Sequence, residues 1–359
     1  MKGYPNSVRN VTISDPYILA DPVSKKYYLY SARFNLDLFG EEKPTFGGKF
    51  FVMESPDLFN WSVPKECFNA YETGFWGDKD YWAPECHYYK GKYYIFSSFR
   101  AEGTYRRCQA LVADSPFGPF KPIKNYPVTP EGWQCLDASL YVDRQGKPYM
   151  IFCHEWTQVQ DGQICGIELS EDLGDAVGAP FILFRASDAK WREDRLGYLP
   201  DEKMTWINGF ITDGCYAHRM EDGSLIMLWS NYGRHGYAVA YAKSKSGEIF
   251  GPWEQVDIPL YVMDGGHAML FRRFSDNQLM MSFHSPNHPH DKKRMLLFEM
   301  EEKDGNIYTL NECTGNWFNI DKFREPIGYY SADLKVPPVA TTYAKPPVAP
   351  KKEEDKKEE

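Results

Sequence analysis

A two-strand pattern occurs five times along the chain, and this repetition limits the possible folds more than any other feature. Each copy starts with a polar or aromatic residue, continues as an alternating apolar strand, turns through polar residues and returns as a second alternating strand. Successive copies begin roughly 50 to 80 residues apart, a spacing typical of propeller blades when the repeated unit is made of strands. Five first residues are taken as equivalent: Asp15, Trp82, Asp137, Asp213 and His267.

The segments that follow each strand pair complete a four-stranded repeat. A third apolar run follows in every copy, for example 109–115 (QALVADS), and Gly-Pro-aromatic endings such as 118–120 lead into a short edge strand. Helical periodicity is almost absent. The sequence therefore predicts an all-β fold, a five-bladed β-propeller over residues 1–335. Residues 336–359 are Pro-rich and then Lys/Glu-rich, which predicts a disordered tail.

Hairpin geometry predicts which residues share a face of this propeller. The first strand of each blade leaves one face and the second strand returns to it. The ends of the second strands, which include Glu155 and Trp156 in the third copy, should therefore meet the five first residues around one polar pocket. A Trp-rich insert, 188–210, precedes the fourth copy and is expected over or beside it.

Charge and composition narrow the classes of function. The chain has 359 residues, a net charge of −9 and 16% aromatic residues. A negative charge without a basic stripe argues against a nucleic-acid partner, whereas abundant Tyr and Trp suit both strand pairing and stacking on sugar rings. The eight cysteines form no C-x-x-C pair, so we expect reduced, buried thiols and no zinc site.

The hydropathy pattern bears on location. No run approaches the ~18 apolar residues of a membrane span, so no membrane partner is expected. The N-terminal residues lack the apolar region of a signal peptide, which predicts a cytoplasmic protein, or a secreted or periplasmic one if a leader has been removed. The sequence leaves the oligomeric state open.

Three of the five first residues are aspartates: Asp15, Asp137 and Asp213. A single Asp before Pro or Gly is usually an ordinary turn residue, but three at equivalent positions of a repeat favour a chemical role. Carboxylates held close together raise one another's pKa. Glycoside hydrolysis needs one ionised and one protonated carboxyl group, about 6.5–9.5 Å apart when the reaction inverts the anomeric centre.

The motifs around these residues are similar to those of one family. Residues 14–17 (SDPY), 82–85 (WAPE) and 136–143 (LDASLYVD) together resemble glycoside hydrolase family 43. Members of that family are five-bladed β-propellers that cleave arabinose, xylose or galactose from plant polysaccharides with inversion. The likeness extends from about residue 13 to residue 287 and covers most of the chain.

The resemblance implies a role for three of the first residues. Asp15 would be the general base, and Asp137 would tune the pKa of the general acid and orient it. His267 would lie on the propeller axis, where many members bind a calcium ion through water molecules. No cofactor is required by this chemistry, and a structural calcium ion is the one metal that the resemblance suggests.

The fourth repeat departs from the family pattern. Family members usually carry Glu-Gly-Pro there, with the Glu as general acid, whereas this chain has Asp213-Gly214-Cys215. Asp is one methylene shorter, and a misplacement of ~1 Å can cost a hundredfold in rate. Either Asp213 donates the proton to a substrate bound slightly nearer, or Glu155 does so from the third blade. Glu155 could instead form a salt bridge to Arg33 or Arg100.

Sugar-binding residues are predicted from the same face. Aromatic side chains are candidates for stacking or hydrogen bonding with a sugar, although each could equally pack in the core. These aromatic candidates are Tyr17, Trp82 and Trp156. The candidates for binding sugar hydroxyls are Arg33, Arg100, Asn231, His284, Asn287 and His288.

The sequence thus predicts an inverting glycoside hydrolase that acts on an oligo- or polysaccharide. The resemblance favours release of a terminal α-L-arabinofuranosyl residue, followed by β-xylosyl or β-galactosyl residues. Two alternatives stay open. One is a phosphorylase on a similar frame, which would use phosphate in place of water and need cationic side chains near the base. The other is a propeller that binds carbohydrate without catalysis, which the altered fourth repeat could reflect.

Overall fold

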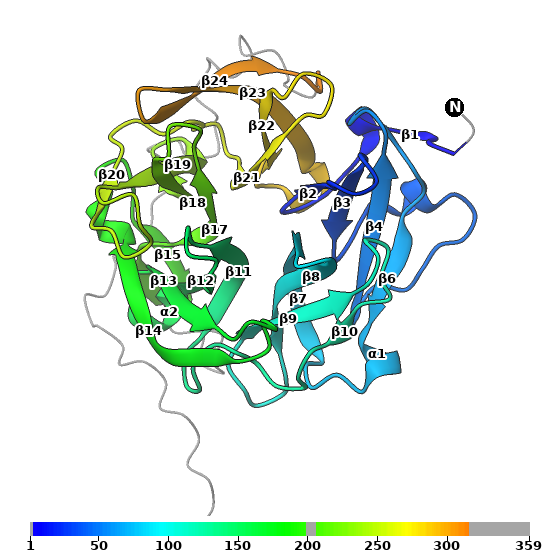
Figure 1. Ribbon diagram of the computed structural model, residues 1–359, viewed down its shortest axis with the longest axis horizontal. Helices are drawn as coiled ribbons and strands as arrows, with labels where there is room; N and C mark the ends of the chain where they lie inside the picture. Colours follow the sequence, from blue (N-terminus) through cyan, green and yellow to red (C-terminus); the bar gives the residue numbers. More distant parts are fainter. Residues whose placement is uncertain (1–2, 199–205, 316–359) are drawn as a thin grey trace, which may run out of the picture.

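The computed structural model describes residues 3–198 and 206–315. Five four-stranded antiparallel sheets surround a central axis, and each is built from one continuous stretch of chain (Figure 1). This arrangement confirms the predicted all-β, five-bladed propeller. The predicted tail, 336–359, lies outside the described residues.

The five blades follow one another around the axis in sequence order. Within each blade, the strands run in sequence order from the innermost to the outermost. Blade 1 consists of β2 (Tyr17–Ala20), β3 (Tyr27–Ser31), β4 (Lys49–Ser55) and β6 (Lys65–Asn69). Blade 2 consists of β7 (Lys79–Tyr89), β8 (Lys92–Arg100), β9 (Arg107–Ala113) and β10 (Lys121–Pro122). Blade 3 consists of β11 (Cys135–Val142), β12 (Pro148–His154), β13 (Gln163–Leu169) and β14 (Ala176–Arg185).

The last two blades complete the ring, and short elements connect the sheets. Blade 4 consists of β17 (Asp213–Arg219), β18 (Leu225–Gly233), β19 (Gly236–Ser244) and β20 (Trp253–Gln255). Blade 5 consists of β21 (Gly266–Arg272), β22 (Leu279–Ser285), β23 (Arg294–Lys303) and β24 (Asn306–Glu312). The remaining strands are β1 (Asn6–Ser7), β5 (Asn60–Trp61), β15 (Arg195–Tyr198) and β16 (Trp206–Gly209).

The helical segments are all single turns. Within residues 3–198 and 206–315, the two α-helical turns are α1 (Ala70–Thr73) and α2 (Trp156–Val159). The 3-10 turns are η1 (Val8–Asn10), η2 (Leu36–Phe39), η3 (Ala186–Asp188) and η4 (His290–Lys292). In the described part of the chain, no helix is long and apolar enough to cross a membrane.

Packing between neighbouring blades explains why the middle strands are buried on both sides. Every residue of β3 and of β12 is buried, because each face of a blade is covered by the adjacent blade. Hydrophobic clusters fill the spaces between blades 2 and 3, 3 and 4, and 4 and 5, and a larger cluster links blade 1 to its neighbours. All eight cysteines are free and seven are buried, which confirms the prediction of buried thiols.

The inner strands share an irregularity that determines which residues are equivalent. The pairing of β7, β11, β17 and β21 with the next strand shifts register near the start of each strand, which marks a β-bulge. A residue with positive φ occurs at this place in blades 2 to 5 and just before β2 in blade 1, and β7 has a second one, Asp80, nearer its start. The five equivalent residues are Asp15, Ala83, Asp137, Gly214 and His267. The predicted equivalence is therefore wrong for Trp82 and Asp213, which each lie one residue earlier.

Hydrogen bonds from these positions join consecutive blades. The backbone N–H of Asp137 donates to Oγ of Ser98 (3.1 Å), and that of His267 donates to Oγ of Ser230 (2.9 Å). In each case the acceptor lies on the second strand of the preceding blade. The N–H of Asp15 donates to Nδ1 of His284 (3.1 Å), so the same bond closes the ring between blades 5 and 1.

The insert before blade 4 lies beside the central opening. Its strands β15 and β16 form a two-stranded sheet, and Ile207 packs with Trp156, Ile211 and Tyr232. This placement agrees with the expectation that the insert would lie over or beside the fourth repeat. Residues 199–205 of the insert fall outside the described part of the chain.

We predict that burial between blades, more than strand propensity, determines stability. Ile95 on β8 is fully buried, so Ile95→Ala should lower the free energy of unfolding by about 2–5 kcal/mol. Ile258 is 81% exposed and serves as the matched control, because Ile258→Ala should change stability by no more than about 0.5 kcal/mol. Chemical denaturation measures both variants. Equal losses would contradict the proposed role of the blade interfaces.

Candidate active site

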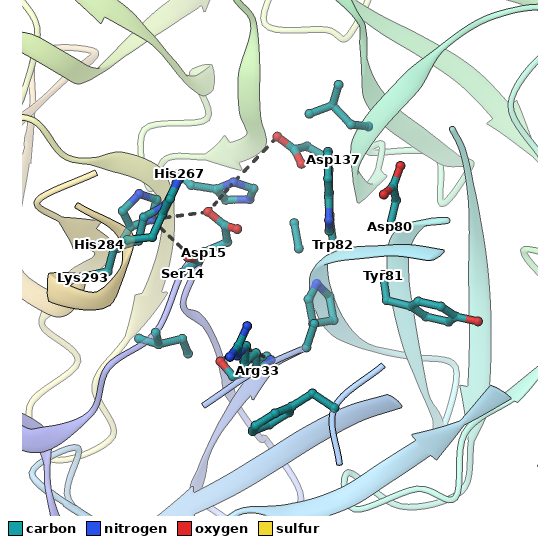
Figure 2. Close-up of a pocket in the computed structure, with 18 of the residues that line it drawn as sticks. Ser14, Asp15, Arg33, Asp80, Tyr81, Trp82, Asp137, His267, His284 and Lys293 are labelled. Atoms are coloured by element: carbon teal, nitrogen blue, oxygen red, sulfur yellow. Dashed lines mark hydrogen bonds and ion pairs between the residues drawn. The ribbon is translucent and has the colours of Figure 1, made fainter. Parts of the chain in front are cut away.

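A cavity of about 1380 Å³ opens where the inner strands begin around the axis. Its floor holds Asp15, Asp137 and Asp213, and Glu155 lines the wall. Figure 2 shows Asp15 and Asp137 on either side of His267, with Trp82 beside them. The structure thus brings all four predicted catalytic carboxyl groups into one cavity.

Asp15 is held by two histidines of blade 5. Its Oδ1 lies 3.2 Å from Nδ1 of His267 and 3.3 Å from Nδ1 of His284. The other ring nitrogen of His284 lies 3.0 Å from Oδ1 of Asn287, which fixes the orientation of the ring. Burial alone would raise the pKa of Asp15, but the protonated His267 holds it well below its ordinary value. Asp15 is therefore ionised, as a general base must be.

Asp137 lies deeper on the axis and is almost completely buried. The backbone N–H of Gly214 donates to its Oδ2 (2.7 Å), and Nδ1 of His267 lies 3.7 Å from the same oxygen. Burial and the nearby charge of Asp15 raise the pKa of Asp137, while His267 and the Gly214 bond oppose the rise. Asp137 therefore links the side of the cavity that holds Asp15 to the start of blade 4.

His267 carries the positive charge at the centre of this group. Burial would lower its pKa, but the carboxylates of Asp15 and Asp137 raise the pKa of His267 to about 10. The imidazole is thus protonated and bridges two acidic side chains that would otherwise repel each other. It stabilises the ionised form of both.

Asp213 occupies a different environment from Asp15. The hydroxyl of Tyr237 donates to its Oδ2 (3.0 Å), and no cationic side chain among the described residues lies within ion-pair distance of its carboxyl group. Burial and the negative charges of Asp137 and Glu155 raise the pKa of Asp213 well above its ordinary value. Asp213 therefore retains a proton at a pH where Asp15 has lost its own.

Glu155 is paired with a cation that sequence reasoning missed. Nη1 of Arg106 lies 2.8 Å from its Oε2, and the guanidinium group stacks 3.7 Å above the ring of Trp82. Burial raises the pKa of Glu155, while the charge and hydrogen bond of Arg106 oppose the rise. The structure corrects the expected partners, because Arg100 pairs with Asp80 (2.8 Å) instead.

The predicted sugar-binding residues divide into two groups. Trp82, Trp156, Arg33 and His284 line the cavity, as does Asn287. Trp82 is 44% exposed and offers an accessible ring, whereas Trp156 is mostly buried.

The other predicted binding residues lie elsewhere. Tyr17 lines a separate cavity of about 340 Å³ and contacts His87 (3.3 Å). Asn231 is fully buried, and its Oδ1 accepts a hydrogen bond from the N–H of Tyr232 (2.7 Å). Arg100 and His288 do not line the main cavity, because Asp80 holds Arg100 and the ring of His288 lies 3.2 Å from the hydroxyl of Tyr232. Hairpin geometry predicted the right face but not the direction of these side chains.

Three cavity residues whose side chains bear on the carboxyl groups were among those not predicted from the sequence. Arg106 lies in the connection before β9, and Tyr237 lies at the start of β19. Lys293 precedes β23, is 5% exposed, and its pKa is lowered by burial although Asp15 and Asp213 oppose this. None belongs to a first strand or to the end of a second strand, so the repeat pattern carried no signal for them.

The axis residues set limits on a metal site. The described residues contain no group of three or more His, Cys, Asp or Glu side chains arranged to hold a metal ion. Nδ1 of His267 faces two carboxylates, and the protonated ring has no free nitrogen lone pair for a metal ion. These residues therefore fit only an ion whose ligands are water molecules.

Comparisons with known proteins agree with this fold. The family model described as glycosyl hydrolases family 43 matches residues 4–306. A solved endo-arabinase from Bacteroides thetaiotaomicron VPI-5482 is 38% identical with a TM-score of 0.74, and the match covers 84% of this chain and 99% of that one. A thermostable family-43 glycoside hydrolase is 25% identical with a TM-score of 0.68, covering 84% and 93% of the two chains.

Two curated relatives match shorter segments. An extracellular endo-α-(1→5)-L-arabinanase from Bacillus subtilis (strain 168) is 24% identical over 212 residues, 56% of this chain and 58% of its own length. A xylosidase/arabinosidase 43A from Humicola insolens is 35% identical over 101 residues, 28% of this chain and 29% of its own. The matches thus span little more than half of the first relative and under a third of the second.

A five-bladed propeller with acidic side chains converging on its axis defines the class of carbohydrate-cleaving propellers. Within that class, the chain belongs to glycosyl hydrolases family 43.

We predict that the close approach of blade 4 to His267 is needed for the site. A Cβ on Gly214 would lie 2.8 Å from Cα of His267, and the residue has a φ of +57°. Gly132 has a φ of +83° with nothing within 4 Å, so Gly132→Ala carries the backbone cost without the clash. Gly214→Ala should lose about 1–3 kcal/mol more stability than Gly132→Ala through overpacking, and should also lower kcat.

Urea denaturation and initial rates measure the two effects in this pair of variants. If both variants lost the same stability and Gly214→Ala kept wild-type kcat, the close packing of Gly214 on His267 would not matter to the site.

Proposed function

We propose that this protein is an inverting glycosidase that releases terminal α-L-arabinofuranosyl residues from an oligo- or polysaccharide. The observation that carries the proposal is the opposite shift of two carboxyl groups in one cavity. The pKa of Asp15 is held below its ordinary value and that of Asp213 is raised above it. Such a pair provides a base and an acid at the same pH.

In this mechanism, Asp15 accepts a proton from a water molecule that attacks the anomeric carbon. Asp213 donates its proton to the oxygen of the leaving group, and the bond between that oxygen and the anomeric carbon breaks. The carboxylate of Asp137 accepts a hydrogen bond from the backbone N–H of Gly214, the residue after Asp213. This bond fixes the start of β17. Its negative charge also raises the pKa of Asp213 and keeps that group protonated.

The choice of Asp213 over Glu155 as donor rests on their neighbours. Arg106 lies 2.8 Å from Glu155 and favours its ionised form, so Glu155 is less suited to release a proton. Asp213 receives a hydrogen bond only from the neutral hydroxyl of Tyr237 among the described side chains. We therefore assign Glu155 to hold Arg106 in place against Trp82.

The sugar is proposed from the activities for which the similar proteins are named. The similar proteins include an endo-arabinase, an endo-arabinanase and a xylosidase/arabinosidase, which are all named for cleavage at arabinose or xylose units. We rank α-L-arabinofuranosyl first, then β-xylosyl and β-galactosyl. Hydrolysis is preferred to phosphorolysis because an ionised Asp15 would repel a phosphate ion in the place of the attacking water. Turnover of nitrophenyl arabinofuranoside, xyloside and galactoside without phosphate tests both statements.

A hydrated calcium ion near His267 stays part of the proposal. Its charge would stabilise the acidic residues around the axis, and its contact with His267 would run through a water molecule. Metal analysis of the purified protein would test this, and absence of stoichiometric calcium would contradict it.

We predict that Asp15→Asn removes the general base and lowers kcat/KM by about 10² to 10⁴-fold on every substrate. The amide cannot accept the water's proton, while the cavity keeps its shape. Asp257 is exposed and pairs with Lys190, so Asp257→Asn should keep wild-type rates. Initial rates and circular dichroism of both variants make the comparison. Retained hydrolysis by folded Asp15→Asn protein would refute the assignment.

We predict that the leaving group separates the two candidate donors. Asp213→Asn should lose far more activity on an arabino-oligosaccharide than on nitrophenyl arabinofuranoside, because nitrophenolate leaves without protonation. Glu155→Gln should lose a similar factor on both substrates. The opposite pattern would make Glu155 the donor.

The pH dependence follows from the same assignment. Asp213 has a raised pKa and acts protonated, so kcat/KM on the oligosaccharide should fall as pH rises through that pKa. This alkaline limb should be missing from the profile of Asp213→Asn on the nitrophenyl substrate. A limb that survives in this variant would belong to another group.

A further inference from the structure

The cavity is larger than one sugar needs. Its volume of about 1380 Å³ exceeds the ~300–1,000 Å³ of pockets that enclose a drug-sized ligand. The catalytic carboxyl groups occupy only the part near the axis. The rest extends over blade 1, where Phe46, Gly47 and Gly48 line it just before β4 begins.

An exposed aromatic ring adjoins this outer part of the cavity. Tyr71, on the single turn α1, is 78% exposed. A Cβ placed on Gly48 would lie 3.0 Å from Cε2 and 3.3 Å from Cζ of Tyr71, so the hydroxyl end of the ring lies against the backbone that lines the cavity. A side chain at position 48 would press on this ring, so Gly48 allows the ring to lie directly against the backbone.

The support beneath the ring is fixed. The N–H of Ala70 donates to the carbonyl of Gly48 (2.8 Å), which ties α1 to the start of β4. The side chain of Asn69 caps the turn by accepting from the N–H of Tyr71 (3.1 Å). The nearby charge of Lys49 is neutralised by Glu66 (2.7 Å). The surface around the ring is therefore held in place.

We propose that Tyr71 is a sugar-binding platform at the outer end of the cavity, where it binds a distal residue of a neutral polysaccharide chain. The flat, apolar ring face suits the apolar face of a pentose ring, and the phenol hydroxyl suits its hydroxyl groups. The chain would run from the cleavage site beside Trp82 along Phe46 and Gly48 to Tyr71. This inference rests on the proposed glycosidase function and extends its substrate from a single sugar to a longer chain.

The test compares long and short substrates in matched variants. With α-1,5-linked arabinohexaose, Tyr71→Ala should raise KM about 3- to 10-fold with little change in kcat, because stacking is lost only at a distance from the reacting bond. With nitrophenyl arabinofuranoside, the same variant should match the wild type. Tyr71→Phe retains the ring, so its KM for arabinohexaose should lie between those of the wild type and Tyr71→Ala.

Tyr308 provides the control for an exposed tyrosine outside the cavity. It lies on β24, the outer strand of blade 5, and is 47% exposed. Tyr308→Ala should leave both substrates unaffected. An unchanged KM for the hexaose in Tyr71→Ala would overturn the platform, and so would an equal loss on both substrates, because that would indicate a structural defect.

A binding measurement separates failure of this inference from failure of the proposed function. In gels that contain linear arabinan or xylan, wild-type protein should migrate more slowly than Tyr71→Ala and at the same rate as Tyr308→Ala. If the wild type cleaves neither substrate, the glycosidase assignment fails while the gel still tests the platform. Equal migration of wild type and Tyr71→Ala in both gels would overturn the platform.

Discussion

The acidic residues at the propeller axis depend on their contacts with the protonated imidazole of His267. Buried carboxyl groups repel one another, and a cavity that held Asp15, Asp137 and Asp213 without a cation would favour protonation of all three. His267 contacts the first two at 3.2 and 3.7 Å. Among the described side chains, only the hydroxyl of Tyr237 donates a hydrogen bond to Asp213. One cation placed off-centre thus makes one side of the cavity basic and the other acidic, although the surrounding blades are similar.

The backbone that delivers these side chains is common to all blades. Each inner strand has a residue of positive φ near or just before its start. In blades 2 to 5 this residue lies at a β-bulge in the pairing of the inner strand with the second strand. Asp137 and His267 occupy this position, and Gly214 occupies it in blade 4. The residue at this position decides which group faces the axis. Asp137 places a carboxylate there and His267 an imidazole, whereas Gly214 has no side chain and leaves room for His267. Asp213 precedes the bulge, so its carboxyl group enters the cavity from a different backbone position than Asp15 does.

The same geometry explains what could and could not be predicted from the sequence. Strand repeats and turn residues are local signals, and they were sufficient for the fold, the catalytic face and the convergence of the carboxyl groups. The bulge lies at the start of each strand, ahead of the alternating residues, so the alternation does not reveal it. The sequence pattern therefore matches Trp82 and Asp213 one residue too early. Asn231 ends on the predicted face but points into the core. Arg106 lies in a connection, where no repeat pattern reveals that it will meet Glu155.

Charge and substrate length are controlled in different parts of the cavity. The pKa values that matter arise from buried groups at the axis, whose interactions are strong because water is largely excluded there. At the outer rim near Gly48 and Tyr71, Lys49 is paired with Glu66, and no rim residue is among the main causes of the pKa shifts of Asp15 and Asp213. A change at this rim therefore alters how a sugar chain is held without altering the protonation of Asp15 or Asp213. Propellers of this kind can vary the substrate through the connections between strands while the axis keeps the same chemistry, because the two parts share a cavity but little electrostatic coupling.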